Sequence, residues 1–318
     1  MTAAARLRGL LSGSQPLVLP GVYDPFGAVM AERAGLHAVY LSGASLAYTL
    51  LGRPDLGLVD AGQLVDAAQR ICRRVSVPVV VDADTGFGST LNVELMVSRL
   101  AQAGVAAIQL EDQSFPKRCG HLSGKSLVSC DEMTAKLRAA LAVRGADGPL
   151  IIARTDAVAV EGLDSAIERS EAYVAAGADI LFVEALEDES QIDLVARRFA
   201  GRVPLLVNQV EGGRTPLLTP DRFRALGVSI VLVPGGLIRA VARTMEQYFE
   251  SLSSNASTEA FRGQMLDFGQ LNAILETEAE LARSLSYAAD APASRPPQGQ
   301  EQHPTSSGGG GNHAVRNR

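Results

Sequence analysis

The sequence predicts an α/β protein built as a (β/α)8 barrel, and three observations lead to this class. Eight short runs rich in Val, Ile and Leu recur along the chain, segments with helical periodicity separate them, and several helices end in Ala-Gly just before the next run. The runs are almost continuously apolar, as expected for parallel strands buried on both faces. Eight strand–helix units in roughly 250 residues fit a closed barrel.

The expected strands follow one another at the spacing of a barrel. They occupy residues 17–22, 38–42, 77–82, 106–111, 150–154, 179–184, 204–208 and 229–233. Ala34-Gly35, Ala103-Gly104 and Ala176-Gly177 each end a helix, because glycine readily adopts the left-handed conformation that terminates one. The alternative is a doubly wound open sheet, but no GxGxxG motif follows the first strand to favour its dinucleotide-binding form.

The C-terminal part of the chain changes character twice. A helical pattern returns from about residue 258 to residue 287, so we expect residues 1–287 to form one barrel domain with additional C-terminal helices. Residues 288–318 contain Pro296-Pro297, glutamines and four consecutive glycines, a composition that cannot build a core. We expect this tail to be disordered.

The amino-acid composition argues against nucleic acid and membranes as binding partners of this protein. The chain has 318 residues with a net charge of −6, which does not attract nucleic acid or an anionic membrane. No apolar run reaches the roughly 18 residues that cross a bilayer, and the N-terminal residues lack the apolar core of a signal peptide. Three cysteines without a CxxC motif suit a reducing cytoplasm. We therefore expect a cytoplasmic protein that acts on a small molecule.

Polar residues gather where the expected strands end, which is where barrels of this type keep their active sites. Many are carboxylates, whose mutual repulsion a divalent cation relieves. Oxygen ligands favour Mg²⁺ or Mn²⁺, and the body of the chain holds only His37 and His121 for a histidine-based centre. The strand-end residues are Ser42, Gly43, Ala44, Asp82, Asp84, Glu111, Asp112, Arg154, Asp156, Glu184, Asn208 and Arg239.

Each of these groups has a plainer interpretation. Asp82 and Asp84 point to the same side if the strand stays extended, and otherwise cap the next turn. The 42–44 segment offers N–H groups and a hydroxyl to a carboxylate or enolate, or is an ordinary turn. Arg154 can grip a substrate carboxylate in bidentate fashion, pair with a neighbouring acid, or do both.

The segment Lys117-Arg118-Cys119-Gly120-His121 places a thiol among two cations and a histidine, which should give it an unusual pKa. No separate His with Asn or Asp suggests the nucleophile of a protease or amidase. Beside a metal site, a thiol that donates a proton to a carbanion fits better, with His121 tuning it.

Residues from about 17 to 275 resemble the isocitrate lyase/phosphoenolpyruvate mutase superfamily. The resemblance rests on Glu111-Asp112-Gln113 with the 117–121 segment, and on the segments 40–43, 51–57, 82–88 and 153–156, which match in order and spacing. It implies a (β/α)8 barrel, Mg²⁺ and often a tetramer of paired subunits that exchange their last barrel helix.

The resemblance also implies roles for individual residues. Ser42, Gly43 and Ala44 would hold the keto-acid moiety, Arg154 would grip a carboxylate, and Cys119 beside Gly120 would be the proton donor. Mg²⁺ would be bound largely through water by Asp82, Asp84 and Glu111. Tyr40 is the candidate base for a substrate hydroxyl. The remaining matches to substrate-contacting positions are Asp55, Glu184, Asn208 and Arg239.

Two features point to a branch of the superfamily. Phe268 stands where 2-methylisocitrate lyases carry an arginine that binds an extra carboxylate, and a phenylalanine cannot pair with one. Glu211-Gly212-Gly213 is similar to the 2,3-dimethylmalate lyase, petal-death-protein and carboxyphosphonoenolpyruvate mutase branch. The expected activity is Mg²⁺-dependent cleavage of a 2-hydroxy dicarboxylate, of the 2-alkylmalate or 2-methylisocitrate type, to an α-keto acid and a carboxylic acid. Phosphonomutase chemistry, oxaloacetate hydrolysis or decarboxylation, and a non-catalytic barrel are the alternatives.

Overall fold

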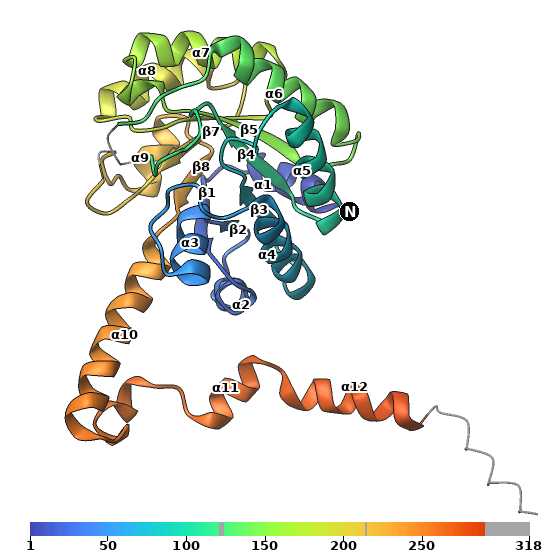
Figure 1. The fold of residues 1–318 in the computed structure, drawn as a ribbon, viewed down its shortest axis with the longest axis vertical. Coiled ribbons are helices and arrows are strands. Elements are labelled where there is room, and N and C mark those ends of the chain that lie inside the picture. The colour runs from blue at the N-terminus through green and yellow to red at the C-terminus, as the bar shows by residue number, and fades with distance from the viewer. Residues whose placement is uncertain (121–123, 214, 290–318) are drawn as a thin grey trace, which may run out of the picture. The chain divides into compact units, whose positions relative to one another are not determined.

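The computed structural model describes residues 1–120, 124–213 and 215–289. Eight parallel strands close into a barrel in sequence order, with β8 pairing back onto β1 (Figure 1). Closure confirms the predicted fold class over the open sheet. Every strand lies within two residues of its predicted bounds. The strands are β1 Leu17–Val22, β2 Val39–Leu41, β3 Val79–Asp82, β4 Ala107–Glu111, β5 Leu150–Thr155, β6 Ile180–Val183, β7 Leu205–Asn208 and β8 Ile230–Val233.

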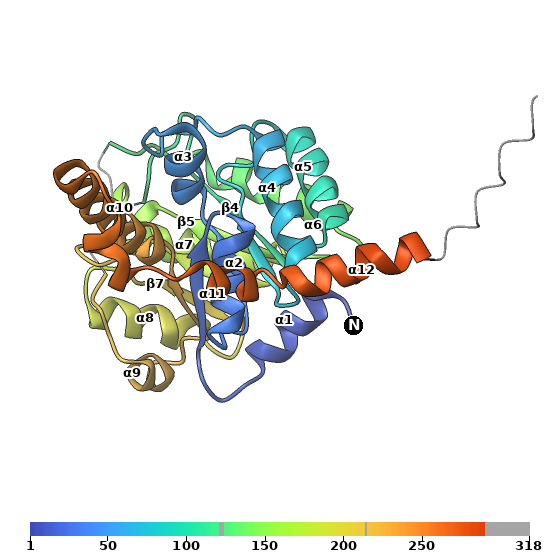
Figure 2. The ribbon, with the colours of Figure 1, turned by 90° about the horizontal axis from the view of Figure 1, so that it is seen from below.

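Helices surround the strands and begin at residues suited to that position. Asp24, Asp60 and Ser129 each accept a hydrogen bond from a backbone N–H of the first helical turn, which satisfies a donor that the helix itself cannot. Figure 2 shows α4, α5 and α6 side by side on the outside of the barrel. The helices of this part are α1 Ala3–Leu11, α2 Pro25–Arg33, α3 Gly43–Leu51, α4 Ala61–Arg74, α5 Thr90–Ala103, α6 Cys130–Val143, α7 Leu163–Ala175, α8 Glu189–Phe199 and α9 Pro220–Ala225, with the 3₁₀ turn η1 Ala157–Ala159.

The chain divides into two compact units, Met1–Gln247 and the part from Tyr248 onward. Helix α10 Gly236–Asn255 begins in the first unit and ends in the second. The second unit continues with η2 Glu259–Gln264, α11 Phe268–Ile274 and α12 Thr277–Ala289. Within it, the ring of Tyr248 packs edge-on against Phe261 at a centroid distance of 5.5 Å. The helical pattern expected after residue 258 is thus present, while the predicted disorder concerns residues that lie almost entirely outside the described part.

The barrel interior is apolar along the strands and polar where the strands end. Leu19, Val80, Ile152 and Leu206 are buried in one cluster, to which Leu7 of α1 also belongs. Successive side chains of a strand point to opposite faces, so the inward positions recur every second residue. The last inward position of a strand is polar in several cases, and the barrel therefore presents charged groups where its strands end.

None of the helices that the structure describes combines the length and apolar character needed to span a membrane.

Candidate active site

A cavity of about 200 Å³ opens at the carboxyl ends of the strands. Most of the predicted site residues line it: Tyr40, Ser42, Ala44, Asp55, Asp82, Glu111, Cys119, Gly120, Arg154, Glu184, Asn208 and Arg239. Gly43 and Asp84 lie directly behind this lining, because a Cβ at Gly43 would lie 3.3 Å from Asp82 Oδ2 and 3.4 Å from Asp84 Oδ1. His121 lies outside the described residues.

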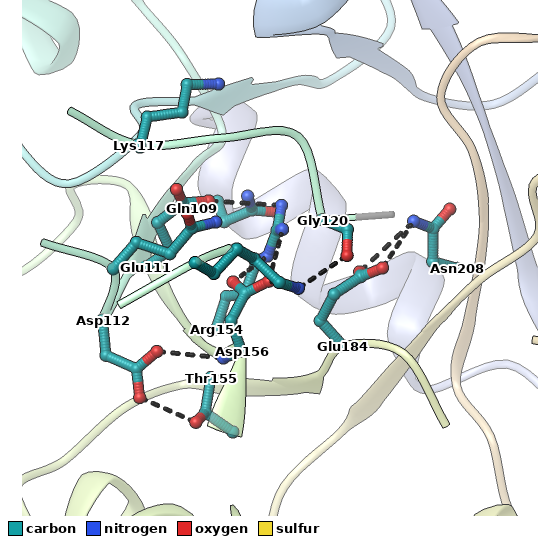
Figure 3. A network of polar contacts seen from close by, with 12 residues as sticks. Gln109, Glu111, Asp112, Lys117, Gly120, Arg154, Thr155, Asp156, Glu184 and Asn208 are labelled. Atoms are coloured by element: carbon teal, nitrogen blue, oxygen red, sulfur yellow. Dashed lines mark hydrogen bonds and ion pairs between the residues drawn. The ribbon is translucent and has the colours of Figure 1, made fainter. Parts of the chain in front are cut away.

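The two neighbouring acids at the end of β4 face in opposite directions. Glu111 points toward the cavity, whereas Asp112 points away and accepts a hydrogen bond from Thr155 Oγ1 at 2.7 Å (Figure 3). Asp112 also accepts a hydrogen bond from Tyr173 Oη at 2.8 Å. The inclusion of Asp112 in a ring of acids at the mouth was therefore wrong. Strand alternation explains the error, since adjacent residues of a strand cannot share a face.

The N-terminus of α3 forms one wall of the cavity. Ser42 is the N-cap of this helix, and its Oγ accepts a hydrogen bond from Ser45 N at 3.3 Å. Gly43 and Ala44 are the first two helical residues, so their N–H groups have no carbonyl partner within the helix. The predicted turn and the predicted anion cradle are thus compatible, because a helix start supplies both.

The segment after β3 is turned rather than extended. Asp82 is the last residue of the strand, while Asp84 has a φ of +47°, in the left-handed region. The extended geometry that would place both carboxylates on one side is therefore absent. Both carboxylates nevertheless lie beside Gly43, and Asp84 also forms an ion pair with Lys117. Aspartate tolerates this backbone conformation better than most residues with a Cβ.

Lys117 is a central residue of the site whose role the sequence did not reveal. Its side chain is 4% exposed, and Nζ lies 2.5 Å from Asp55 Oδ1 and 2.7 Å from Asp84 Oδ1. Burial lowers the pKa of Lys117, but Asp84, Glu111 and Asp55 outweigh it and hold the pKa well above its ordinary value. The ammonium therefore stays charged and offsets part of the carboxylate repulsion. The only indication in the sequence was that Lys117 begins the 117–121 segment, which follows the acidic end of a strand.

Arg154 joins the acids of the cavity to those behind it. Its NH1 lies 3.2 Å from Glu111 Oε2, and its Nε and NH2 donate to Asp156 at 3.0 and 3.1 Å. The ion pair with neighbouring acids that the sequence allowed is present. Because Asp156 fixes the guanidinium plane, Arg154 presents a preorganised cation to the cavity.

Tyr40 is buried beneath the cavity and linked to the acids through Gln109. Its hydroxyl donates to Gln109 Oε1 at 2.9 Å, and Gln109 Nε2 donates to Asp82 Oδ1 at 3.0 Å. Burial and the charge of Asp82 raise the pKa of Tyr40 well above its ordinary value. The phenol therefore keeps its proton at neutral pH, which weighs against its predicted role as a base. Gln109, an inward residue two positions before Glu111, was not predicted.

The acids of the site suit a divalent cation that is held partly through water. Burial raises the pKa of Asp84 to about 7 and that of Glu111 well above its usual range, so neither is an easily ionised carboxyl in the free protein. Glu111 Oε1 is buried without a hydrogen-bond donor among the described residues. Within the same residues, no three His, Cys, Asp or Glu side chains lie close enough together to enclose a metal ion. Mg²⁺, which keeps several waters, fits such a set.

Gly120 lies against two charged side chains of the barrel. A Cβ at this position would lie 2.5 Å from Arg154 NH2 and 2.9 Å from the Glu184 carboxyl group. Glu184 in turn accepts hydrogen bonds from Asn208 Nδ2 at 3.3 and 3.5 Å, as Figure 3 shows. Position 120 therefore has no room for a side chain, and the preceding residue, Cys119, lines the cavity.

Replacement of Gly120 by alanine should lower kcat/KM by about a hundredfold, because a displacement of about 1 Å at a catalytic group has effects of this size. Steady-state kinetics measure the loss. Gly9→Ala in α1 is the matched control, since its added Cβ meets no atom within 4 Å. Equal kinetics of Gly120→Ala and wild type would contradict the close contact.

Part of the cavity lining is apolar. It includes Tyr48, Val210, Leu232, Pro234 and Ile238. Arg239 also lines the cavity, and it forms an ion pair with the exposed Glu211. The cavity thus combines a charged end with a wall that suits alkyl groups.

Comparisons with known proteins identify the family of this chain. A family model described as phosphoenolpyruvate phosphomutase matches residues 7–253. The chain is 48% identical over 240 residues to a 2-methylisocitrate lyase of Aeropyrum pernix, covering 76% of each protein. It is 40% identical over 278 residues to a 2,3-dimethylmalate lyase of Eubacterium barkeri, covering 87% of this chain and 96% of the relative.

A solved structure of oxaloacetate acetylhydrolase with the inhibitor 3,3-difluorooxalacetate is similar throughout. The TM-score is 0.84 at 32% sequence identity, and the match covers 92% of this chain and 98% of the other.

Proposed function

The chain belongs to the phosphoenolpyruvate mutase/isocitrate lyase superfamily, and it is a lyase of that superfamily. We propose that it cleaves the C2–C3 bond of a 2-hydroxy dicarboxylate. The products are an α-keto acid and a carboxylic acid. One observation carries the proposal: a thiol, a preorganised arginine and oxygen ligands for a divalent cation line the same cavity.

The residues of the chain divide the work as follows. Arg154 binds a substrate carboxylate, and the N–H groups of Gly43 and Ala44 bind the keto-acid oxygens. When the 2-hydroxyl gives its proton to a carboxylate that lines the cavity, the C2–C3 electron pair passes to the departing carboxylate fragment, which becomes an enediolate. The Cys119 thiol gives its proton to the carbon of that fragment. The Gly120 contact with Arg154 and Glu184 keeps water from the anion.

Mg²⁺ is the cofactor of the proposal, held by Asp82, Asp84 and Glu111 partly through water. When bound, it supplies positive charge that stabilises the developing negative charge on the keto-acid oxygens. Lys117 and Arg154 keep these ligands in place through their contacts with Asp84 and Glu111.

The affinity for Mg²⁺ should be about tenfold weaker at pH 6 than at pH 8, because the cation competes with a proton for Asp84. The pKa of Asp84 is raised to about 7, so this carboxyl is protonated at the lower pH and ionised at the higher one. Isothermal titration calorimetry in two buffers of different ionisation enthalpy measures both the affinity and the proton released. Asp66→Asn, at an exposed position of α4, should keep the same pH dependence. An affinity independent of pH would contradict the assignment.

The substrate that we favour is a 2-alkylmalate or 2,3-dialkylmalate rather than a tricarboxylate. The wall around Val210, Leu232 and Ile238 suits an alkyl substituent, and Arg239 already pairs with Glu211. Because the chain has relatives named 2-methylisocitrate lyase and 2,3-dimethylmalate lyase, a test must include substrates of both kinds.

The decisive experiment incubates the purified protein and Mg²⁺ with 2-alkylmalates, 2-methylisocitrate, isocitrate or oxaloacetate. Lactate dehydrogenase and NADH report the α-keto acid formed, and proton NMR detects the acetate that hydrolysis of oxaloacetate releases together with oxalate. Turnover of an alkylmalate supports the proposal, and hydrolysis of oxaloacetate alone overturns it. Phosphonate formed from a phosphoenolpyruvate-type substrate, detected by phosphorus NMR, would instead identify a mutase.

We also propose that the protein is a homo-oligomer, most simply a tetramer. Helix α10 has no buried residue in the single chain and exposes Met245 and Phe249. Light scattering of the purified protein tests this, and a monomer would contradict it.

A further inference from the structure

A second buried lysine, Lys125, lies behind the cavity. Its side chain is 1% exposed, and Nζ donates to the carbonyl oxygen of Gly120 at 2.6 Å and to Asp156 Oδ1 at 2.7 Å. Lys125 does not line the cavity, so it does not touch a substrate there.

The two partners of Lys125 connect different parts of the site. Asp156 follows β5 and holds the Arg154 guanidinium through Nε and NH2. Gly120 follows Cys119 directly in the chain and lies against Arg154 and Glu184. One ammonium group therefore joins the backbone beside the thiol to the carboxylate that orients the arginine (Figure 3 shows Gly120, Asp156 and Arg154).

The contacts of the Lys125 ammonium suit a residue that fixes the position of the backbone at Gly120. A buried ammonium must be neutralised and hydrogen-bonded, and the Asp156 carboxylate and the Gly120 carbonyl do both. Arg154 shares Asp156 with Lys125, and Glu111 and Glu184 supply further negative charge around Arg154. A neutral side chain at position 125 would leave the Gly120 carbonyl without this donor.

We propose that Lys125 is a positioning residue that fastens Gly120 against Arg154 and Glu184 and thereby holds the Cys119 thiol over the cavity. The catalytic meaning of that position rests on the proposed function, in which Cys119 delivers a proton. The position itself does not, because it is a property of the free protein.

The test is the rate at which iodoacetamide alkylates Cys119 in the full-length protein, followed peptide by peptide by mass spectrometry. The pH dependence of that rate separates the thiol pKa from the plateau rate of the fully ionised thiolate. This separation matters because removal of a nearby cation also raises a thiol pKa. In Lys125→Met, the plateau rate at Cys119 should rise about tenfold through loss of a charge-assisted hydrogen bond. Lys125→Arg, which keeps the charge and donors, should restore most of the protection.

Cys72 in α4 provides a reference within the same molecule, because it is half-buried and far along the chain from the loop. Its alkylation rate should not change. Lys136→Met is the matched variant: Lys136 is also buried, but its Nζ contacts Thr85 O at 3.3 Å and Glu132 at 3.4 Å instead of Gly120. It should leave the plateau rate at Cys119 unchanged.

Two results would overturn the proposal. One is an unchanged plateau rate at Cys119 in Lys125→Met, which would show that Lys125 acts through charge alone. The other is a parallel rise at Cys72 and Cys119, which would show general loosening of the fold.

Kinetics then connect position to catalysis. With whichever dicarboxylate the wild-type protein cleaves, Lys125→Met should lower kcat about tenfold with a smaller change in KM, and Lys125→Arg should recover it. The alkylation experiment needs no substrate. A protein that cleaves none of the dicarboxylates would therefore refute the proposed function while leaving the role of Lys125 decided by the thiol alone.

Discussion

Cys119→Ser should leave a folded protein that binds Mg²⁺ normally but has a kcat lower by a factor of about 10² to 10⁴, the usual contribution of a positioned acid. Serine is close in size to cysteine but is a far weaker acid, so the step that should suffer is protonation of the departing enediolate. The thiol lines the cavity together with Lys117, Gly120 and Arg154, which is where that fragment would form.

The measurement is single-turnover kinetics of the keto acid, with Mg²⁺ affinity determined by calorimetry on the same sample. Cys130→Ser is the matched control, because Cys130 is the first residue of α6 and lies outside the cavity. It should retain wild-type turnover. A kcat of Cys119→Ser within about threefold of wild type would remove the thiol from the mechanism.

Lys117→Met should destabilise the protein by about 3–5 kcal/mol at pH 8, the typical cost of removing one partner of a buried ion pair. The variant leaves Asp55 and Asp84 buried without their cation, and it removes positive charge that also acts on Glu111. Urea denaturation measures the loss as a lower midpoint at an unchanged slope. The same variant should turn over far more slowly, because the Asp84 side of the cation site is no longer held.

The destabilisation should depend on pH in a defined direction. The pKa of Asp84 in the folded protein is about 7, above its ordinary value of 3.8, so between these values the native state binds a proton that the unfolded state does not. Stability contributed by this group is lost as the pH rises through about 7. Without Lys117, an ionised Asp84 costs more still. The difference between Lys117→Met and wild type should therefore shrink as the pH falls from 8 toward 5.

A double variant separates charge from packing. Lys117→Met combined with Asp84→Asn removes both members of the pair and should recover part of the lost stability at pH 8, because no lone carboxylate remains at that contact. Mg²⁺ should also stabilise Lys117→Met in proportion to how well it binds there. If Lys117→Met unfolds at the same urea concentration as wild type, Lys117 is not an essential counter-charge.

Much of the fold was predictable because its signals are local. A strand buried on both faces must be apolar throughout, and a helix that ends in left-handed glycine shows its end in the sequence, as at Gly104. Strand ends could be named within two residues, and most predicted site residues do line the cavity. Asp112 shows the limit: the sequence gives its place at a strand end, but alternation turns it toward Thr155 and Tyr173.

The sequence alone determined the barrel, the superfamily and the polar residue types at the strand ends, because each follows from periodicity or from a short motif. Only the tertiary structure decided how those residues are paired. Lys117 stands 62 residues from Asp55, and Lys125 stands 31 residues from Asp156, yet each pair is in contact. A buried charge takes its pKa and its partner from groups that closure of the barrel brings around it. This is why Lys117 acts as a counter-charge for the acids and why Tyr40 is unfavourable as a base. It is also why Lys125 holds the backbone beside Cys119 in position.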